Sequence, residues 1–298
     1  MSCTPTPGRL HLSVTGGPAG PVSLDTETPD NLAAAALPAE TGATVTAGPV
    51  NGWCELIEKV GWAAGRDPAL PTLAVVRLVR EPGAVLRVEA TDSYRTHRAG
   101  WAEPTDIAVD TLMPADAVGR AVRLLTGGDP TGQLTVHVDA EHIHWRTGRV
   151  RITARAQPGT YPDLEAAREQ VLADADVTFT VDRAATLAAL TTAGRLAAAT
   201  GDGRVGIHPR VADHTAEVTV DGRGPVPAWR TVVRLGEATG PVHPLQFNPR
   251  YARQAFAFLD GPTVSVAAAT GRRAVHLQSG HRHALVMQLR PTAAGQAA

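Results

Sequence analysis

Residues 114–126 read P-A-D-A-V-G-R-A-V-R-L-L-T, a stretch of helical character that opens on proline. Proline suits the first turn of a helix, because the N–H that it lacks would have no partner there. Residues 248–259, N-P-R-Y-A-R-Q-A-F-A-F-L, open in the same way after a capping asparagine. Apolar side chains recur at helical spacing in residues 51–64, and Asp182 can cap a helix over 183–199. The sequence therefore predicts four helices, at 51–64, 114–126, 183–199 and 248–259.

The four predicted helices start at nearly even intervals, and short alternating or β-branched segments fill the chain between them. Gly, Pro and Asp turns separate these segments, which is typical of strands. The predicted strands are 73–79, 84–90, 133–138, 141–146, 149–155, 204–208, 215–220, 229–235, 263–268, 273–277 and 284–289. The repeating unit is one helix followed by about three strands, used four times. A unit of this kind packs its helices on antiparallel sheets, so the predicted fold class is α+β.

A longer period is also present. Pro114 and Pro249 stand in matching helix openings, and V-T-A at 45–47 precedes the first helix as V-T-F-T at 177–180 precedes the third. This period predicts two homologous domains of about 130 residues. The linker between them is expected near residues 157–175.

Composition argues against several classes of protein. The net charge is −1, so there is no global basic signal for nucleic acid, although a balanced total can hide a basic face. The two cysteines, Cys3 and Cys54, do not suggest a disulfide scaffold and fit a reducing cytosol. Residues 1–30 lack the pattern of a signal peptide, and the apolar runs are too short and Ala-rich to span a bilayer. We expect a soluble intracellular protein.

Several motifs that could carry chemistry have simpler explanations. G-D-G-R-V-G at 201–206 has dinucleotide-binding spacing, but a helix precedes it and a strand follows, the reverse of what that motif requires. Turn roles explain Asp92 and Asp163. Two pairs of histidines could each share a strand face, but zinc usually takes three or four ligands. These pairs are His142 with His144 and His281 with His283. We expect no catalytic residues, no metal and no cofactor.

Five short segments, taken in order, resemble those of one known family. They are L-P-T-L-A-V-V-R-L-V at 70–79, L-R-V-E-A-T-D-S-Y-R at 86–95, G-T-Y-P-D-L-E-A at 159–166, F-N-P-R-Y at 247–251 and L-V-M-Q-L-R at 285–290. Together they resemble the bacterial β sliding clamp, the ring that tethers DNA polymerase III to its template. The resemblance covers roughly 44–291. It implies DNA-clamp repeats, each with two helices packed on curved antiparallel sheets.

The resemblance also implies a domain organisation. Residues 44–172 look like the family's middle domain and 173–291 like its C-terminal domain. Residues 1–43 would be a stub and linker that resembles the end of a lost first domain, with two strands in 9–30 around a Gly/Pro turn. Equally, the true start could lie upstream. Residues 292–298 are expected to be a disordered tail.

In this family, the counterpart of T-D-S-Y-R at 91–95 lines a pocket for a short linear motif of polymerases and clamp loaders. A partner tail needs an apolar slot with a few polar groups that orient it. The expected apolar walls are Leu73, Pro162, Leu285, Val286 and Met287, the expected polar rim is Thr91, Ser93, Tyr94 and Arg95, and Thr96 is expected in the same pocket. The alternative is that Tyr94 and Arg95 only cap a strand and stack together. Thr96 and Gln288 depart from the family, which often has an apolar residue and a proline there.

The family also places its helices on the inner wall of the ring, facing DNA phosphates. The resemblance therefore implies a DNA-facing set of Lys59, Arg66, Arg120, Arg123, Arg183, Arg195, Arg250 and Arg253. A few phosphate contacts give weak, salt-sensitive binding without sequence preference. The alternative is that these side chains are ordinary solvated helix faces.

We therefore expect a non-catalytic sliding-clamp homologue that associates with duplex DNA and docks polymerase and clamp-loader motifs in the cytoplasm, at the nucleoid. It would self-associate into a ring, and a trimer would supply the six domains that such rings contain. One alternative is a ring-less paralogue that acts as a regulatory interaction module. A second is an unrelated α+β enzyme that uses His and Asp residues.

Overall fold

The computed structural model describes residues 2–6, 9–13, 26–27, 43–101, 106–129, 131–148, 150–201, 203–222 and 227–290. The chain forms two compact units, Met1–Glu40 and Thr41–Ala298. In the first unit, β1 (Ser2–Thr6), β2 (Arg9–Ser13) and β3 (Thr26–Glu27) form an antiparallel sheet in that order. The predicted Gly/Pro turn after β2 and the predicted tail lie outside the described residues, as does nearly all of the predicted linker over 31–43.

The second unit repeats one pattern of a strand, a helix and three strands four times along the chain. The first repeat is β4 (Ala43–Pro49), α1 (Val50–Gly61), β5 (Val75–Arg80), β6 (Leu86–Thr91) and β7 (Arg95–Trp101). The second is β8 (Val109–Pro114), α2 (Ala115–Thr126), β9 (Gln133–Val138), β10 (His142–Thr147) and β11 (Val150–Arg155). The third is β12 (Val177–Asp182), α4 (Arg183–Thr200), β13 (Val205–Arg210), β14 (Thr215–Val220) and β15 (Trp229–Thr239). The fourth is β16 (Leu245–Phe247), α5 (Pro249–Phe258), β17 (Thr263–Ala268), β18 (Ala274–Ser279) and β19 (Arg282–Met287).

Short polar side chains cap the N-termini of α4 and α5, the helices of the second half. The Asp182 carboxylate accepts a hydrogen bond from the Ala185 N–H at 2.7 Å, and the Asn248 side chain accepts one from the Arg250 N–H at 3.0 Å. Such caps satisfy backbone donors that the first turn leaves free. Pro114 differs slightly from the prediction, because it lies at the N-cap of α2 and the helix starts at Ala115. The four predicted helices and the α+β fold class are otherwise confirmed.

A twelve-stranded sheet joins the two halves of this unit. Its order is β16-β13-β14-β15-β12-β17-β18-β19-β7-β6-β5-β8, and all of its neighbours are antiparallel. The junction, here called the seam, is the pairing of β19 with β7, in which Leu285 lies opposite Thr96 and His283 opposite Arg98. Beside the seam, Nδ1 of buried His97 donates to the Lys59 carbonyl at 2.8 Å, and the His97 ring stacks on Phe258. The seam therefore joins helices as well as strands.

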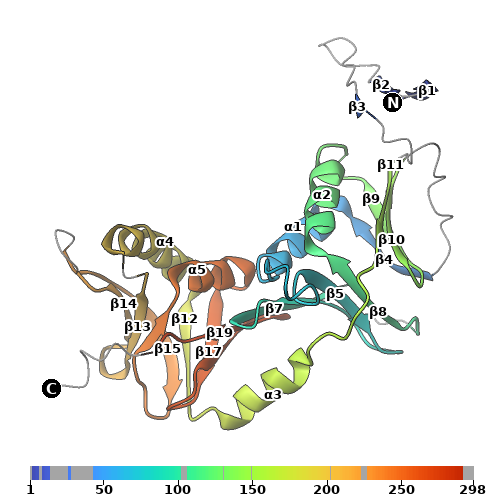
Figure 1. The fold of residues 1–298 in the computed structure, drawn as a ribbon. Helices are drawn as coiled ribbons and strands as arrows, with labels where there is room; N and C mark the ends of the chain where they lie inside the picture. The colour runs from blue at the N-terminus through green and yellow to red at the C-terminus, as the bar shows by residue number, and fades with distance from the viewer. Residues whose placement is uncertain are drawn as a thin grey trace. The chain divides into compact units, whose positions relative to one another are not determined.

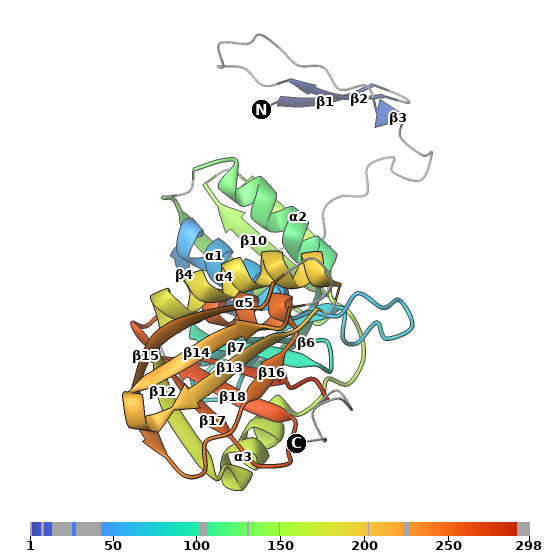
Figure 2. The ribbon, with the colours of Figure 1, turned by 90° about the vertical axis from the view of Figure 1, so that its left-hand side faces the viewer.

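The helices α1, α2, α4 and α5 lie on one side of the long sheet (Figure 1). Helix α1 packs on α2, α4 packs on α5, and α1 also contacts α5 across the seam. In the turned view, α4 and α5 lie over the strands of the second half (Figure 2). A four-stranded sheet, β11-β10-β9-β4, completes the first half. One continuous apolar core runs through both halves and buries large side chains such as Trp53, Trp145 and Phe256.

One helix was not expected. The segment 157–175, predicted only as a linker, contains α3 (Leu164–Asp174), which contacts β17 and β18 on the opposite side of the long sheet from the other helices (Figure 1). Strands β7, β8 and β16 were also missed by the sequence prediction. The division into domains at 172/173 stays a prediction, since both halves share one compact unit and one sheet.

Candidate partner-binding site

The turn between β6 and β7 is built by its own side chains. The Asp92 carboxylate accepts hydrogen bonds from the N–H groups of Tyr94 at 3.0 Å and Arg95 at 3.1 Å. The Thr91 hydroxyl donates to the Arg95 carbonyl at 2.8 Å, and Ser93 takes a φ of 72°. These local bonds hold a tight turn and leave the Tyr94 ring 57% exposed. The turn role predicted for Asp92 is confirmed.

Arg95 is the buried centre of this region, with only 4% of its surface exposed. Its Nε donates to the Asp92 carboxylate at 3.0 Å, and its two terminal nitrogens donate to the Gln254 side-chain oxygen and the Trp62 carbonyl. Its guanidinium lies 4.2 Å from the centre of the Tyr251 ring. Burial lowers the pKa of Arg95, and Asp92 opposes that shift. The predicted alternative of stacking on Tyr94 is wrong, because the ring that Arg95 covers is Tyr251 on α5.

A cavity of about 470 Å³, here called the turn cavity, opens beside this turn. The segment after α1, the β6–β7 turn and the first turn of α5 supply its walls. Its lining is Ala64, Gly65, Arg66, Asp67, Leu70, Leu73, Asp92, Ser93, Tyr94, Arg95, Arg250 and Tyr251. Leu70 and Tyr94 are large apolar groups that are half or more exposed at its rim. The arrangement combines apolar walls with polar groups held in fixed positions, as ligand sites do.

Four of the predicted pocket residues lie together in this cavity, namely Leu73, Ser93, Tyr94 and Arg95. The other six are not among its lining residues. Thr91 is buried beneath the turn, Pro162 is exposed on the segment before α3, and Val286 is buried in the core. Thr96, Leu285 and Met287 take part in the seam, where the Thr96 hydroxyl accepts from the Leu285 N–H and the Met287 N–H donates to the Tyr94 carbonyl. None of these six residues lines the turn cavity, and their part in a partner pocket stays a prediction.

Sequence reasoning missed Tyr251, Gln254 and Trp62. Asn248 and the following proline identified the helix that carries Tyr251 and Gln254, but nothing in the local pattern indicates that its face reaches a turn 159 residues away. Trp62 contributes through its backbone carbonyl, which leaves no trace in residue type. Leu70 could have been predicted as an exposed apolar residue, because it is a single leucine between two prolines, ahead of the predicted strand 73–79.

The predicted DNA-facing residues occupy different environments. Arg66, Arg120, Arg123, Arg195, Arg250 and Arg253 are exposed. Lys59 pairs with Glu55 at 2.7 Å and Arg120 pairs with Asp116 at 2.8 Å, each within its own helix. Arg183 is half-buried and donates to the carbonyls of Gly261 at 2.9 Å and Phe256 at 3.2 Å. Its guanidinium therefore supports the end of α5.

A groove between α4 and α5, here called the arginine groove, collects three of these cations. Its lining is Thr191, Gly194, Arg195, Ala198, Pro249, Arg250 and Arg253, with no acidic residue among them. The groove has a volume of about 420 Å³. Arg250 lines the turn cavity as well, so the two sites share one side chain.

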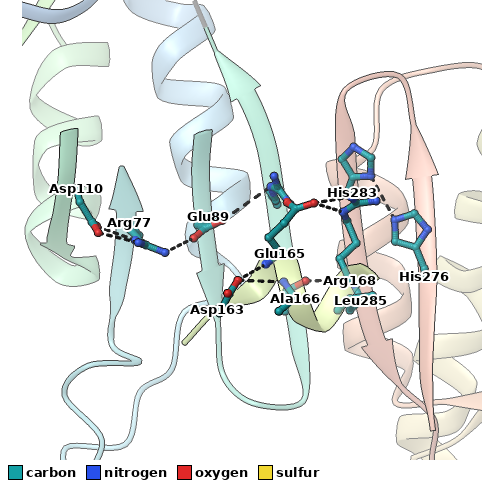
Figure 3. A network of polar contacts seen from close by, with 12 residues as sticks. Arg77, Glu89, Asp110, Asp163, Glu165, Ala166, Arg168, His276, His283 and Leu285 are labelled. Carbon is teal, nitrogen blue, oxygen red and sulfur yellow. Dashed lines mark hydrogen bonds and ion pairs between the residues drawn. The ribbon is translucent and has the colours of Figure 1, made fainter. Parts of the chain in front are cut away.

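A polar network covers the other side of the sheet, beneath α3 (Figure 3). Arg77 bridges the Glu89 carboxylate at 3.0 Å and the Asp110 carboxylate at 2.7 Å. Arg98 connects Glu89 to Glu165 on α3. Burial raises the pKa of Glu89, and the neighbouring arginines oppose that shift. These ion pairs hold α3 against the strands at the seam, so the charged residues of the network have a structural role.

Of the two histidine pairs considered from sequence, His142 and His144 do lie together on β10, with ring centres 6.0 Å apart. His276 and His283 meet across β18 and β19, with ring nitrogens 3.2 Å apart, whereas His281 is exposed. Buried His144 hydrogen-bonds to Thr153 and Asp139. Among the described residues, no group of three His, Cys, Asp or Glu side chains is placed to hold a metal ion. Within the same residues, no helix combines the length and the apolar character needed to cross a membrane.

Comparison with known proteins identifies the fold. No protein-family model matches the sequence, and no curated protein matches it. Solved structures do match. The DNA polymerase sliding clamp of Bacillus subtilis aligns with a TM-score of 0.78 at 18% identity, over 91% of this chain and 70% of that one. A putative DNA polymerase III beta subunit from Eubacterium rectale aligns with a TM-score of 0.77 at 13% identity, over 96% and 74%. The DNA polymerase III beta chain of Streptococcus pneumoniae aligns with a TM-score of 0.75 at 17% identity, over 97% and 75%.

These neighbours are bacterial DNA polymerase III beta sliding clamps, and this chain has their fold. The resemblance found in the sequence is confirmed at the level of the fold. The clamp architecture of helix pairs on antiparallel sheets is confirmed as well. The predicted binding residues stay predictions, because fold similarity at such low identity does not test them.

Proposed function

We propose that this protein is a clamp-like, non-catalytic platform that docks partner proteins through short peptide motifs and associates with duplex DNA. The observation that carries the docking proposal is the turn cavity. Its lining joins Leu73, Ser93, Tyr94 and Arg95, expected from the sequence, to Tyr251 and Arg250 on α5. The expected partners are DNA polymerase and clamp-loader subunits that carry an apolar linear motif.

The physical chemistry of the cavity suits an extended apolar peptide. Leu70, Leu73 and the two tyrosine rings offer apolar surface, and exposed aromatic anchors usually dominate the binding energy of such sites. The Asp92–Arg95 ion pair is internal, so the rim charges left for a ligand are Arg66, Asp67 and Arg250. A peptide with an apolar centre and a polar or acidic flank would match both the apolar surface and the charged rim.

Peptide docking can be tested by fluorescence anisotropy with a labelled peptide of the Gln-Leu-x-Leu-Phe type. Tyr94→Ala and Leu70→Ala should each weaken binding by about tenfold, since each removes exposed apolar contact area at the rim. Leu124→Ala is the matched control, because Leu124 is also an exposed leucine but lies on α2 outside the cavity. Equal weakening by all three variants, or no saturable binding by the wild type, would refute docking at this cavity.

The arginine groove supports the proposed association with DNA. Arg195, Arg250 and Arg253 are exposed and have no acidic neighbour in the groove, so they can meet phosphates without losing an ion pair. Arg66 and Arg123 on the same side of the sheet would add to this surface. Contacts of this type are independent of sequence and weaken as salt rises.

DNA association can be tested by measuring the affinity for a duplex at several salt concentrations. The double variant Arg195→Ala, Arg253→Ala should bind more weakly and lower the salt slope by about 2, roughly one for each lost phosphate contact. Arg272→Ala is the control, because Arg272 is also exposed but lies on the β17–β18 turn, outside the groove, where it pairs with Asp174. An unchanged slope in the double variant would mean that this groove does not meet DNA.

A ring of subunits, of which a trimer is the simplest six-domain form, belongs to the same proposal and is tested by native mass measurement. A position in the cytoplasm at the nucleoid follows from a DNA-associated role. The ring-less regulatory alternative shares the docking cavity but predicts a monomer.

A further inference from the structure

The proposed docking site depends on a residue that does not line it. Within α5, which the structure describes in full, Gln254 is the one polar residue among those that the helix buries. It is 9% exposed, and its side-chain oxygen accepts a hydrogen bond from Arg95. A buried amide is costly unless it is paired, and here its partner is a buried cation that needs an acceptor.

Arg95 connects three walls of the turn cavity through its three acceptors. Asp92 lies in the β6–β7 turn, the Trp62 carbonyl ends α1, and Gln254 belongs to α5. A cation at the last carbonyls of α1 is also favoured by the dipole of that helix. Of these acceptors, Gln254 is the only described side chain from the second half of the molecule, so its bond is the one that crosses the seam.

The position of α5 matters to the cavity because residues of this helix one turn before Gln254 form one of its walls. Tyr251, one turn before Gln254, packs its ring on the Arg95 guanidinium, and Arg250 lines the rim. If the acceptor at 254 were lost, the guanidinium would keep its bonds to the first half but would lose its hydrogen bond to α5, which leaves the packing of the Tyr251 ring. The Tyr251 wall would then be free to shift relative to Tyr94 and Leu70.

We propose that Gln254 is a positioning residue of the docking site, which holds α5 against Arg95 and thereby sets the width of the turn cavity. This inference rests on the proposed docking function. It assigns to Gln254 a role in partner affinity although Gln254 itself does not touch the partner.

The test compares three glutamine variants in the peptide anisotropy assay, with the melting temperature of each recorded. Gln254→Met keeps the length but removes the acceptor, and it should weaken peptide binding by about tenfold, the usual effect of losing a hydrogen bond to a charged group. Gln254→Glu keeps an acceptor toward Arg95 and should bind within about threefold of the wild type. Gln278→Met is the control, because Gln278 lies on β18, outside the turn cavity, and donates to the Gly280 carbonyl.

A mutant cycle with Arg95 separates positioning from general stability. If Gln254 acts through Arg95, adding Gln254→Met to Arg95→Met should cause no further loss of peptide affinity. The double variant also keeps the test available if Gln254→Met alone does not fold, since it leaves no buried charge without an acceptor. Additive losses in the cycle, equal losses for Gln254→Met and Gln254→Glu, or a lowered melting temperature with unchanged affinity would each overturn the proposal. A wild type that does not bind the peptide would overturn the docking function itself, and this inference with it.

Discussion

At the scale of single residues, the turn after β6 shows how local bonds can present one side chain to solvent. Asp92 accepts from two backbone N–H groups, and the chain passes through the left-handed region at Ser93, where φ is 72°. Residues other than Gly, Asn and Asp enter this region at a cost of roughly 1–2 kcal/mol. The turn therefore carries strain directly beside Tyr94, at the rim of the proposed docking site.

This strain leads to a prediction about Ser93. Ser93→Val should lower the free energy of unfolding by about 1–2 kcal/mol, because a β-branched side chain is poorly tolerated at positive φ. Ser93→Gly should leave it unchanged or raise it slightly, since relief of strain offsets the greater freedom of the unfolded chain. Urea unfolding followed by circular dichroism measures both. Equal destabilisation by valine and glycine would show that the hydroxyl, and not the backbone, matters there.

At the scale of secondary-structure elements, α3 depends on its N-cap residue. Asp163 accepts hydrogen bonds from the N–H groups of Glu165 and Ala166, both at 3.0 Å. Only Leu164 of this helix is buried, so packing contributes little and the cap contributes much of its stability. Asp163→Ala should therefore destabilise the protein by about 1 kcal/mol, whereas Asp163→Asn, which keeps a capping oxygen, should not. Hydrogen exchange of the α3 amides would localise the effect, and unchanged exchange there would contradict it.

The elements also show what the sequence could and could not predict. The helices α1, α2, α4 and α5 were predicted because caps, prolines and apolar spacing act over a few residues. Helix α3 was missed because it has almost no buried face, although the cap at Asp163 followed by good helix formers was a usable signal. For the docking site, the residues of the β6–β7 turn were predicted, while Gln254 and Tyr251 were not. Those two reach the turn through tertiary packing, which local patterns do not encode.

At the scale of the whole molecule, stability should depend on pH through the histidine pair near the seam. Burial, with the neighbouring histidine and Arg168, lowers the pKa of His276 to about 4, and burial with Arg168 and Arg98 lowers that of His283 to about 4. The ordinary value is 6.5, so the unfolded chain binds protons first as pH falls. The contribution to stability is complete above pH 6.5 and is lost between pH 6.5 and about 4.

We expect the loss from this pair to reach about 2 kcal/mol in total, reduced from the full linkage value because His283 is partly exposed. The variant His276→Gln, His283→Gln should flatten the decline in unfolding free energy between neutral pH and pH 4 relative to the wild type. Urea unfolding across that range measures it, with His281→Gln as the control for an exposed histidine on the adjacent turn. A decline as steep in the double variant as in the wild type would assign the pH dependence to other groups.

The seam has a consequence for how the chain is made. Thr96 and Leu285, which face each other across it, are 189 residues apart in the chain. During synthesis, β7 leaves the ribosome roughly 10–40 seconds before its partner strand exists, at ordinary rates of translation. For that time the β7 edge is an open template for any other strand, and open edges promote aggregation. The newly made first half therefore carries an open strand edge that can aggregate until the last strand closes the sheet.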